Sequence, residues 1–515
     1  MAHLLGIDIG TSGTKALVCD EGGDVLATAT AAHPDPTGGG PGWSEQQPAD
    51  WWDATVKAVA EVLENAGLRG EDVSAIGLSG QMHGLVCLGD DDPPSARALR
   101  PAILWNDQRT VAECEELEHA AGGRETLIEM TGNPALTGFT APKILWVRKH
   151  EPRIYENTRH LLLPKDYIRF RMTGRYATEV GDASGTSLLD VTRRTWNDDL
   201  LGRLEIDKAL LPECHESHVV SGKLTAWAAS ELGLARGTPV VGGSGDQPAG
   251  AVGNGIVDAG VVSATMGTSG VVFAHADEPR RDPLGRVHTM CSAVEGRWCV
   301  FGCILAAGGA FQWFRNTLGQ NEVDQARRKG VDPYELLVAE AERSKPGAGG
   351  LMFLPYLTGE RCPHPDPYAR GGWLGLTTRH TRSDMIRALL EGVTFGMTDA
   401  LRIIQHMGVH VDNVRLSGGG ARSPFWRQLQ TDAYNLPTAV INAKEGPAYG
   451  VAILAGVGTG VWNSVPEACA AVISEIEHRQ PDPPAAAFYE NAHDRYQQLY
   501  PALKDHFPAL ARLDQ

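Results

Sequence analysis

The sequence lacks the features of several protein classes. Its 515 residues contain no uninterrupted apolar run of about 18 residues, which argues against a membrane span. Basic residues are in deficit, because 46 Lys and Arg against 63 Asp and Glu give a formal net charge of −17. A chain this acidic does not bind nucleic acid or an anionic membrane through its overall field. The first residues carry no basic segment and reach a carboxylate at Asp8, so we expect no secretory signal.

Cysteine spacing and one missing motif exclude two further classes. The nine cysteines are scattered, and the nearest pairs, Cys291/Cys299 and Cys299/Cys303, lack zinc-knuckle spacing. We therefore expect reduced, buried thiols in a cytoplasmic protein. The first apolar strand is not followed by the GxGxxG fingerprint of a dinucleotide-binding fold.

The pattern that is present is typical of an α/β protein. An apolar strand over 4–9, a polar turn over 10–14 and a return strand over 15–19 open the chain. A helix is expected from Pro48 to Gly67, followed by a buried strand over 73–79. Strand and helix signals then alternate up to about residue 241, which is the mark of the α/β class.

A short repeat indicates two related halves. Gly10-Thr11-Ser12-Gly13 recurs as Gly267-Thr268-Ser269-Gly270, each time between two apolar strands. Together with the chain length, the repeat predicts an N-terminal domain over 1–253 and a C-terminal domain over 254–515. A third glycine cluster, 418–420, ends a strand and precedes a helix, so its amides are free to face an anion. Farther upstream, a capping box at 381–384 predicts a long helix through Leu401.

Phosphoryl transfer needs donors for the phosphates, a divalent cation and a base beside the attacking hydroxyl. The two repeated turns supply amides and hydroxyls, and Lys15 is a fixed cation beside the first; ordinary hairpin turns are the alternative. Asp8 interrupts an apolar strand, which indicates either a Mg²⁺ site or a salt-bridged edge residue. Asp246 follows a strand and a glycine turn, which fits either a general base for a sugar hydroxyl or a helix N-cap.

Polar side chains after the strand at 73–79 indicate a small-molecule pocket, because α/β proteins place ligands at the carboxyl ends of strands. Gln81 and His83 offer hydrogen bonds to a polyol, and Met82 offers a surface for its carbon skeleton. Trp105 lies in the polar run that follows. In that run Asp107 and Arg109 fit the pocket or an internal ion pair equally well.

Taken together, these residues resemble the FGGY family of carbohydrate kinases over about residues 4–475. The resemblance rests on the opening motif at 6–15 and on two long signatures in the right order, at 138–146 and 371–392, with a further matching run at 359–367. It implies two actin-like, ribonuclease H-like ATPase domains with an interdomain cleft, and ATP and Mg²⁺ as cofactors. The run at 79–84 with that at 105–109 is similar to the xylulokinase branch of the family, which implies D-xylulose 5-phosphate as the product.

The resemblance also implies a role for each matched residue. Asp246 takes the proton from O5 of the sugar, and Asp8 supports the metal and the phosphates. The substrate-binding set is Gln81, Met82, His83, Trp105, Asp246 and Gln247. The ATP-binding set is Thr11, Ser12, Gly13, Lys15, Gly267, Thr268, Gly308, Gly309, Gly418, Gly419, Gly420 and Ala421.

One departure leaves the sugar open. Xylulokinases usually follow the catalytic Asp with Asn, and this chain has Gln247, whose amide reaches one methylene further. The alternatives are a kinase of D-ribulose, L-ribulose or another polyol, and a non-catalytic nucleotide-binding sensor on the same fold. The expected partners are a small sugar and ATP, with no nucleic acid and no membrane, and a homodimer is compatible with the sequence.

Overall fold

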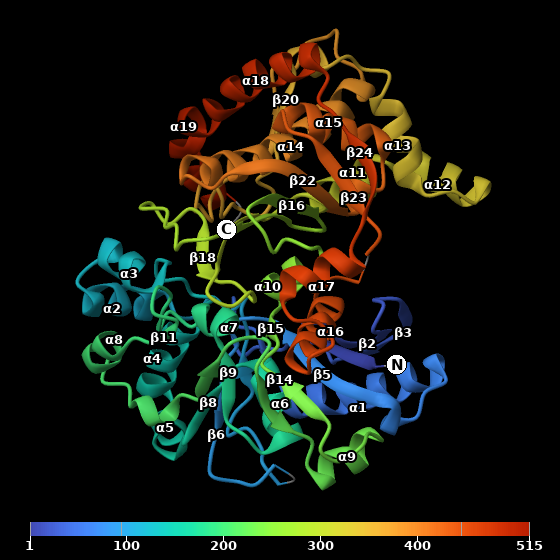
Figure 1. The fold of residues 1–515 in the computed structure, drawn as a ribbon. Coiled ribbons are helices and arrows are strands. Elements are labelled where there is room, and N and C mark those ends of the chain that lie inside the picture. Colours follow the sequence, from blue (N-terminus) through green and yellow to red (C-terminus); the bar gives the residue numbers. More distant parts are fainter. Residues whose placement is uncertain (1, 94, 444, 514–515) are drawn as a thin grey trace.

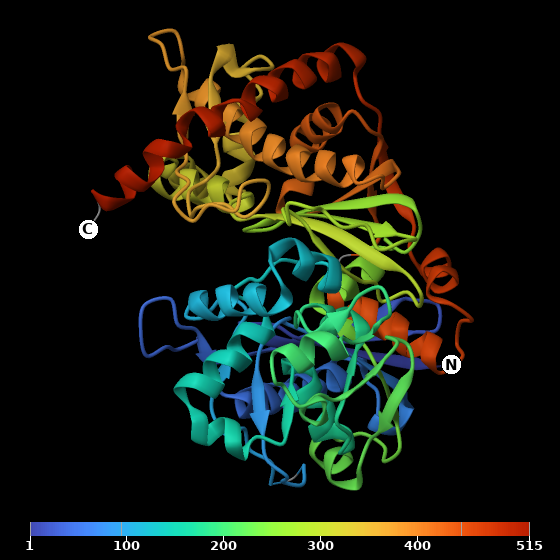
Figure 2. The same cartoon turned by 90° about the vertical axis from the view of Figure 1, so that its left-hand side faces the viewer.

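The chain folds into two lobes, each built on a seven-stranded sheet (Figure 1). The computed structural model describes residues 2–93, 95–443 and 445–513. The lobes lie one above the other in both views, and strands and helices from the middle of the chain occupy the junction (Figure 2). Strands alternate with helices through both lobes, so the α/β prediction is confirmed. No helix of these described residues has the length and apolar character to span a bilayer.

The first sheet places the opening motif in its interior. Its strand order is β13-β14-β5-β1-β2-β3, with β15 also pairing with β5. Strand β1 runs antiparallel to β2 and parallel to β5, so the polar turn after β1 lies beside the carboxyl end of β5. The strands are β1 (His3–Ile9), β2 (Gly13–Asp20), β3 (Val25–Ala32), β5 (Val73–Gly80), β13 (Val220–Lys223), β14 (Pro239–Val241) and β15 (Ser244–Gly245).

The second sheet repeats this arrangement, in the order β18-β19-β17-β16-β22-β23-β24. Strand β16 is antiparallel to β17 and parallel to β22, as β1 is to β2 and β5, so the repeated tetrapeptides occupy equivalent turns. Asp8 lies opposite Ser79 in the first sheet, and Thr265 lies opposite Ser417 in the second. The strands are β16 (Gly260–Met266), β17 (Gly270–Ala276), β18 (His288–Cys291), β19 (Trp298–Ile304), β22 (Val411–Gly418), β23 (Thr438–Ile441) and β24 (Glu475–Arg479).

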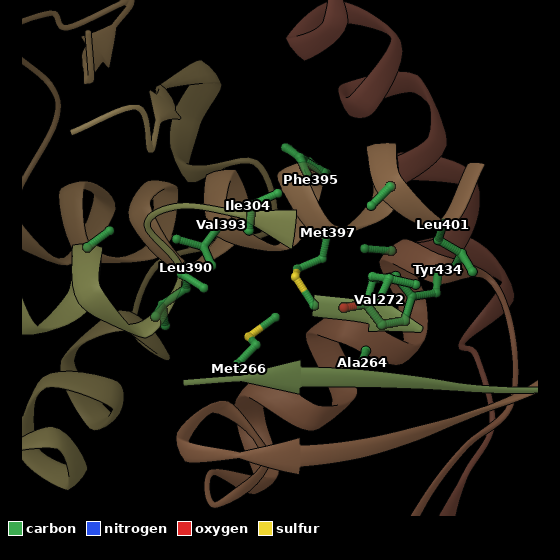
Figure 3. Close-up of a cluster of buried hydrophobic side chains, with 14 of the residues drawn as sticks. Ala264, Met266, Val272, Ile304, Leu390, Val393, Phe395, Met397, Leu401 and Tyr434 are labelled. Carbon is green, nitrogen blue, oxygen red and sulfur yellow. The ribbon is translucent and has the colours of Figure 1, made fainter. Parts of the chain in front are cut away.

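Two long helices form where the sequence predicts them. Helix α1 (Pro48–Ala66) packs on the first sheet and stops at Gly67, whose φ of 64° is a conformation that favours glycine. Helix α14 (Arg382–His406) begins at the predicted capping box. Its buried face, including Val393, Met397 and Leu401, packs against β17, β19 and β20 and forms the core of the second lobe (Figure 3).

Helix α16 (Gly446–Gly458) comes from the second half of the chain but packs on the first sheet, against β1, β5 and helix α10 (Asp246–Gly253). Glycines make this close approach possible: a Cβ at Gly6 or Gly77 would collide with the backbone carbonyls of Ala448 or Val451. The chain therefore returns to the first lobe after residue 445. The domain division at residue 253 stays a prediction.

The remaining elements cover the two lobes. In the first half the helices are α2 (Val111–Ala121), α3 (Arg124–Thr131), α4 (Thr140–His150), α5 (Pro152–Asn157), α6 (Pro164–Thr173), α7 (Val180–Ser184), α8 (Asp198–Arg203) and α9 (Ala226–Leu232). In the second half they are α11 (Gly308–Leu318), α12 (Gln320–Lys329), α13 (Pro333–Ala341), α15 (Pro424–Tyr434), α17 (Val465–Val472), α18 (Pro483–Gln497), α19 (Leu499–Leu503) and α20 (Phe507–Arg512). The short strands are β4 (Glu45–Gln46), β6 (Val86–Leu88), β7 (Ala102–Ile103), β8 (His160–Leu162), β9 (Ala177–Glu179), β10 (Leu189–Asp190), β11 (Thr195–Trp196), β12 (Glu213–His215), β20 (Met352–Leu354) and β21 (Gly372–Leu374).

Candidate active site

Two carboxylates meet at the carboxyl edge of the first sheet. Asp8 lies on β1 opposite Ser79 of β5, and Ser244 of β15 lies opposite the same residue on the other side. Asp246 follows β15 directly as the first residue of α10. Three adjacent strands thus bring together two acids that are 238 positions apart in the sequence.

The structure excludes one of the two alternatives that the sequence left open for each acid. Strand β1 is an interior strand, and no ion pair of Asp8 occurs among residues 2–93, 95–443 and 445–513, so the salt-bridged edge residue is excluded. One oxygen of Asp8, Oδ1, is buried and makes no hydrogen bond to any described group. The N-cap of α10 is Gly245, so the N-cap alternative for Asp246 is wrong.

The local electrostatics bring both carboxyls toward neutral pH. Burial raises the pKa of Asp8 to about 6. Burial, and then the charge of Asp8, raise the pKa of Asp246 to about 7. Oδ1 of Asp246 accepts a 3.4 Å hydrogen bond from Nε2 of Gln247. A carboxylate with a pKa near 7 is matched to proton abstraction at physiological pH.

Gln81 and Trp105 converge on the first glycine turn. The hydroxyl of Thr11 donates to Oε1 of Gln81 at 3.3 Å and accepts from Nε1 of Trp105 at 3.0 Å. Nε2 of Gln81 donates to Oε1 of Gln46 at 3.3 Å. The indole of Trp105 is 39% exposed, so it retains a free surface beside the turn. Ser12, at the tip, is exposed.

His83 is held in one orientation. Its φ is 68°, a strained value for a residue with a side chain. Nδ1 lies 2.8 Å from the carbonyl oxygen of Gly185, and because a carbonyl only accepts, Nδ1 carries the proton. Burial lowers the pKa of His83 well below its usual value, so the ring is neutral and Nε2 is an acceptor for a hydroxyl. Its ring stacks on Phe139 at 4.3 Å, and its own carbonyl accepts from Nζ of Lys143 at 2.8 Å.

Met82 is buried, and the residues at 107–109 form an internal ion pair. Met82 is 3% exposed and packs in an apolar cluster with Phe139 of the first half and Phe273 of the second. Arg109 binds Asp107 at 2.7 Å, and both side chains are buried. The internal ion pair, one of the two readings of the sequence, is confirmed.

Lys15 lies opposite Asp8 across the β1–β2 pair, and it forms an ion pair with Glu445, just before α16. Gly13 begins β2, where the carbonyl of Ala31 leaves no room for a Cβ. Lys15 is therefore held beside the paired carboxylates by a residue from the second half of the chain.

A pocket of about 1010 Å³ in the second lobe collects the other glycine motifs. The predicted residues Gly267, Thr268, Gly308, Gly419 and Gly420 line it, and Gly309, Gly418 and Ala421 are their chain neighbours. The packing here requires glycine: a Cβ on Gly308 would lie 2.5 Å from the carbonyl oxygen of Gly267. A volume of this size suits a nucleotide.

Several site residues were not predicted. The pocket wall also contains Gln312, Arg315, Asp332, Tyr334, Glu335, Arg422 and Trp426. Arg361 follows Glu360 in the run at 359–367 that resembles the family, and its positive charge contributes to the low pKa of His83 and His288. The run at 359–367 carried the family resemblance, but no sequence pattern indicated that Arg361 lies near His83 of the first lobe.

A duplicated α/β fold that combines a glycine-lined pocket with paired carboxylates defines the class of two-lobed phosphotransferases. The chain matches the FGGY family of carbohydrate kinases through its N-terminal domain over residues 3–253 and its C-terminal domain over residues 262–459. It belongs to this family, and the resemblance seen in the sequence is confirmed.

Individual proteins agree with the family assignment. The chain is 37% identical over 505 residues to a xylulose kinase of Bacillus subtilis, covering 98% of each chain. A ligand-bound xylulose kinase from Lactobacillus acidophilus has a TM-score of 0.91 at 26% identity, over 99% of this chain and 100% of the other. A gluconate kinase from the same organism gives 0.90 at 26% identity, over 99% of both chains. The predicted two-domain kinase fold is thus confirmed, and the fold alone does not distinguish these two sugars.

Proposed function

We propose that this carbohydrate kinase transfers the γ-phosphoryl group of ATP to O5 of D-xylulose, with Asp246 as the general base. The observation that carries the proposal is the position of Asp246: a carboxylate with a pKa of about 7, at the same sheet edge as Met82 and His83. The 37% identity to a xylulose kinase over 98% of each chain supports the choice of sugar.

The reaction follows from these positions. Asp246 accepts the proton of the O5 hydroxyl, and the oxygen forms a bond to the γ-phosphorus. The bond between that phosphorus and the β,γ-bridging oxygen breaks, and ADP leaves with the electron pair. Nε2 of His83 accepts a hydrogen bond from a second hydroxyl, and Trp105 covers the sugar from the solvent side. Closing of the two lobes excludes water, which otherwise competes as the acceptor.

The residues present fit Mg²⁺ with Asp8 as its protein partner. The buried Oδ1 of Asp8 has no hydrogen-bond partner among the described groups, and no cluster of three or more metal-ligating side chains occurs among them. Magnesium typically uses one or two carboxylates together with water and phosphate oxygens, so a single aspartate suits it. When bound, the ion neutralises charge on the transferring phosphates.

A second candidate acceptor is another polyol, because of Gln247. Its amide reaches one methylene beyond the usual Asn and already donates to Asp246, so it contacts the base directly. The similarity to a gluconate kinase is consistent with a site that accepts different sugars on one fold. D-ribulose and L-ribulose are the pentulose alternatives.

The test is a coupled ADP-release assay with Mg-ATP and D-xylulose, D-ribulose, L-ribulose, glycerol or gluconate, with a blank that contains no sugar. We expect kcat/KM for D-xylulose to exceed the others by about tenfold or more. A stronger preference for another sugar would move the assignment to that sugar, and fast ATP hydrolysis in the blank would contradict the exclusion of water.

Compartment and assembly complete the proposal. All nine cysteines are free thiols, which supports a cytoplasmic enzyme. The homodimer stays a prediction that light scattering of the purified protein tests.

A further inference from the structure

The carboxylate of Glu179 lies beneath the proposed sugar site and belongs to none of the motifs above. It ends strand β9 and is fully buried. Oε1 accepts hydrogen bonds from the backbone N–H of Asp182 at 2.8 Å and of Gly245 at 3.1 Å. Oε2 accepts from the N–H of Gly181 at 2.6 Å and the hydroxyl of Ser217 at 3.1 Å. One side chain thus joins three separate segments.

Capping of α7 does not by itself explain a glutamate here. Helix N-caps are usually Ser, Thr, Asp or Asn, whose short side chains reach the first free amides. The longer side chain of Glu179 also reaches Gly245, which lies 66 residues further along the chain. Gly245 directly precedes Asp246 and contacts Met82 so closely that a Cβ would lie 2.7 Å from Cγ of Met82.

The helix that Glu179 caps leads to the other side of the sugar site. Helix α7 is followed by Gly185, whose N–H donates to the carbonyl of Asp182 and whose own carbonyl accepts from Nδ1 of His83. A single buried carboxylate is therefore linked through the backbone to Asp246 on one side and to His83 on the other.

Burying this charge requires compensation. Nζ of Lys165 is 3.5 Å from Oε1 of Glu179 and 2.7 Å from Oδ1 of Asp166, and all three side chains are fully buried. Burial opposes the charge of Lys165, but the carboxylates of Asp166, Asp182 and Glu179 hold its pKa above its usual value. Breaking such a buried ionic network is costly, so its retention beneath the site calls for a reason.

We infer that Glu179 is a positioning residue, which fixes the spacing between the base Asp246 and the sugar-binding His83 through the backbone of Gly245 and of α7. The inference rests on the proposed function, because it assigns Glu179 to the same site. Displacing a reacting group by about 1 Å lowers turnover by about 100-fold, so the effect falls on kcat.

The test separates the two contacts of Glu179, one with the first amides of α7 and one with the N–H of Gly245. Glu179→Asp keeps an N-cap acceptor for α7 but shortens the side chain by one methylene, so the bond to Gly245 is lost. Glu179→Gln keeps the length and places an amide among N–H donors, and it serves as the second variant. Glu391→Gln is the matched control: Glu391 is also buried and accepts from the N–H of Gly347 and from Arg387 in the other lobe.

Two measurements are made on each folded variant. In the sugar-kinase assay, E179D is expected to lower kcat about 100-fold with a much smaller change in KM for the sugar. Hydrogen exchange measured by mass spectrometry is expected to show faster exchange over 240–250 and unchanged exchange over 180–185. E391Q is expected to lower thermal stability without the fall in kcat.

The outcomes are distinct. A kcat within about twofold of the native value in both Glu179 variants would overturn the inference, as would a fall in kcat that E391Q matches. Unchanged exchange over 240–250 would overturn it as well. A native enzyme that prefers another sugar would refute the proposed substrate alone, since exchange and kcat with that sugar still report on Glu179.

Discussion

Replacing Asp246 by Asn removes the proposed base while keeping its size. The general-base contribution to a proton transfer is typically 10²–10⁴-fold, so we expect kcat with the sugar to fall by about that factor. The proposed nucleotide pocket is lined by residues of the second lobe that lie between positions 266 and 426, so we expect the affinity for ADP to stay close to the native value.

The pKa of about 7 sets the pH dependence of the native enzyme. The base must be ionised, and the ionised fraction rises from about 10% at pH 6 to about 90% at pH 8. The native kcat/KM is therefore expected to rise about ninefold over that interval, with its midpoint near pH 7. We expect the residual activity of the Asp246→Asn variant to show no such rise with pH.

Stability changes in the opposite direction. A carboxyl whose pKa rises from 3.8 in the unfolded chain to about 7 in the fold stabilises the protein most below pH 4 and loses that contribution as the pH rises to 7. Three pKa units correspond to about 4 kcal/mol, and solvent screening at this partly exposed side chain reduces the figure to about 1–2 kcal/mol. Asn does not titrate, so at pH 8 Tm of the variant is expected to exceed the native Tm by about 1–2 °C, since the unfolding entropy of a 515-residue chain is large.

The assays are coupled ADP release between pH 6 and 8, calorimetric ADP binding, and thermal unfolding at pH 5 and 8. An inactive variant with a lower Tm and lost ADP binding would refute the reasoning, because it would make Asp246 a structural residue. A variant with native kcat would refute the general base itself.

Three further substitutions test the rest of the site. Asp8→Asn removes the proposed Mg²⁺ partner and should lower sugar-dependent turnover by about 100-fold or more. The calorimetric affinity for metal-free ADP should stay unchanged. If turnover of the variant depended on Mg²⁺ concentration as in the native enzyme, the assignment of Asp8 would be contradicted. Gly308→Ala places a Cβ 2.5 Å from the carbonyl oxygen of Gly267. The resulting strain of about 1–3 kcal/mol should raise KM for ATP about tenfold. Gly202→Ala is the control and should leave KM unchanged, because a Cβ at Gly202 meets no atom within 4 Å. Gln247→Asn should change the ratio of kcat/KM between D-xylulose and gluconate, and an unchanged ratio would remove Gln247 from the determinants of sugar specificity.

Local rules predicted the elements that local sequence controls. The strand, turn and strand at 4–19, the helix from Pro48 to Gly67 and the capping box at 381–384 all form as expected. The repeated tetrapeptide predicted two related halves, and its two copies occupy equivalent turns of two sheets. The glycines of 267, 308 and 419–420 came together as predicted, in a pocket that no single motif describes.

These local rules could not predict contacts between residues that are far apart in the sequence. Helix α16 returns to the first lobe because small residues in β1 and β5 admit it, and the relevant glycines lie more than 350 positions away in the sequence. Glu179 sits in a three-residue strand with no motif around it, and its connection to Gly245 exists only once the sheet has formed. Arg361 likewise lies near His83 only because the two lobes approach each other.

The central claim is phosphoryl transfer to O5 of D-xylulose, and the structure of the product tests it most directly. The measurement is a two-dimensional ¹H–³¹P correlation spectrum of the sugar product formed from D-xylulose and Mg-ATP. The account predicts that phosphorus correlates with a pair of methylene protons that also couple to H4, which identifies O5. Correlation with an isolated methylene pair, which identifies O1, or the absence of any sugar phosphate would contradict it.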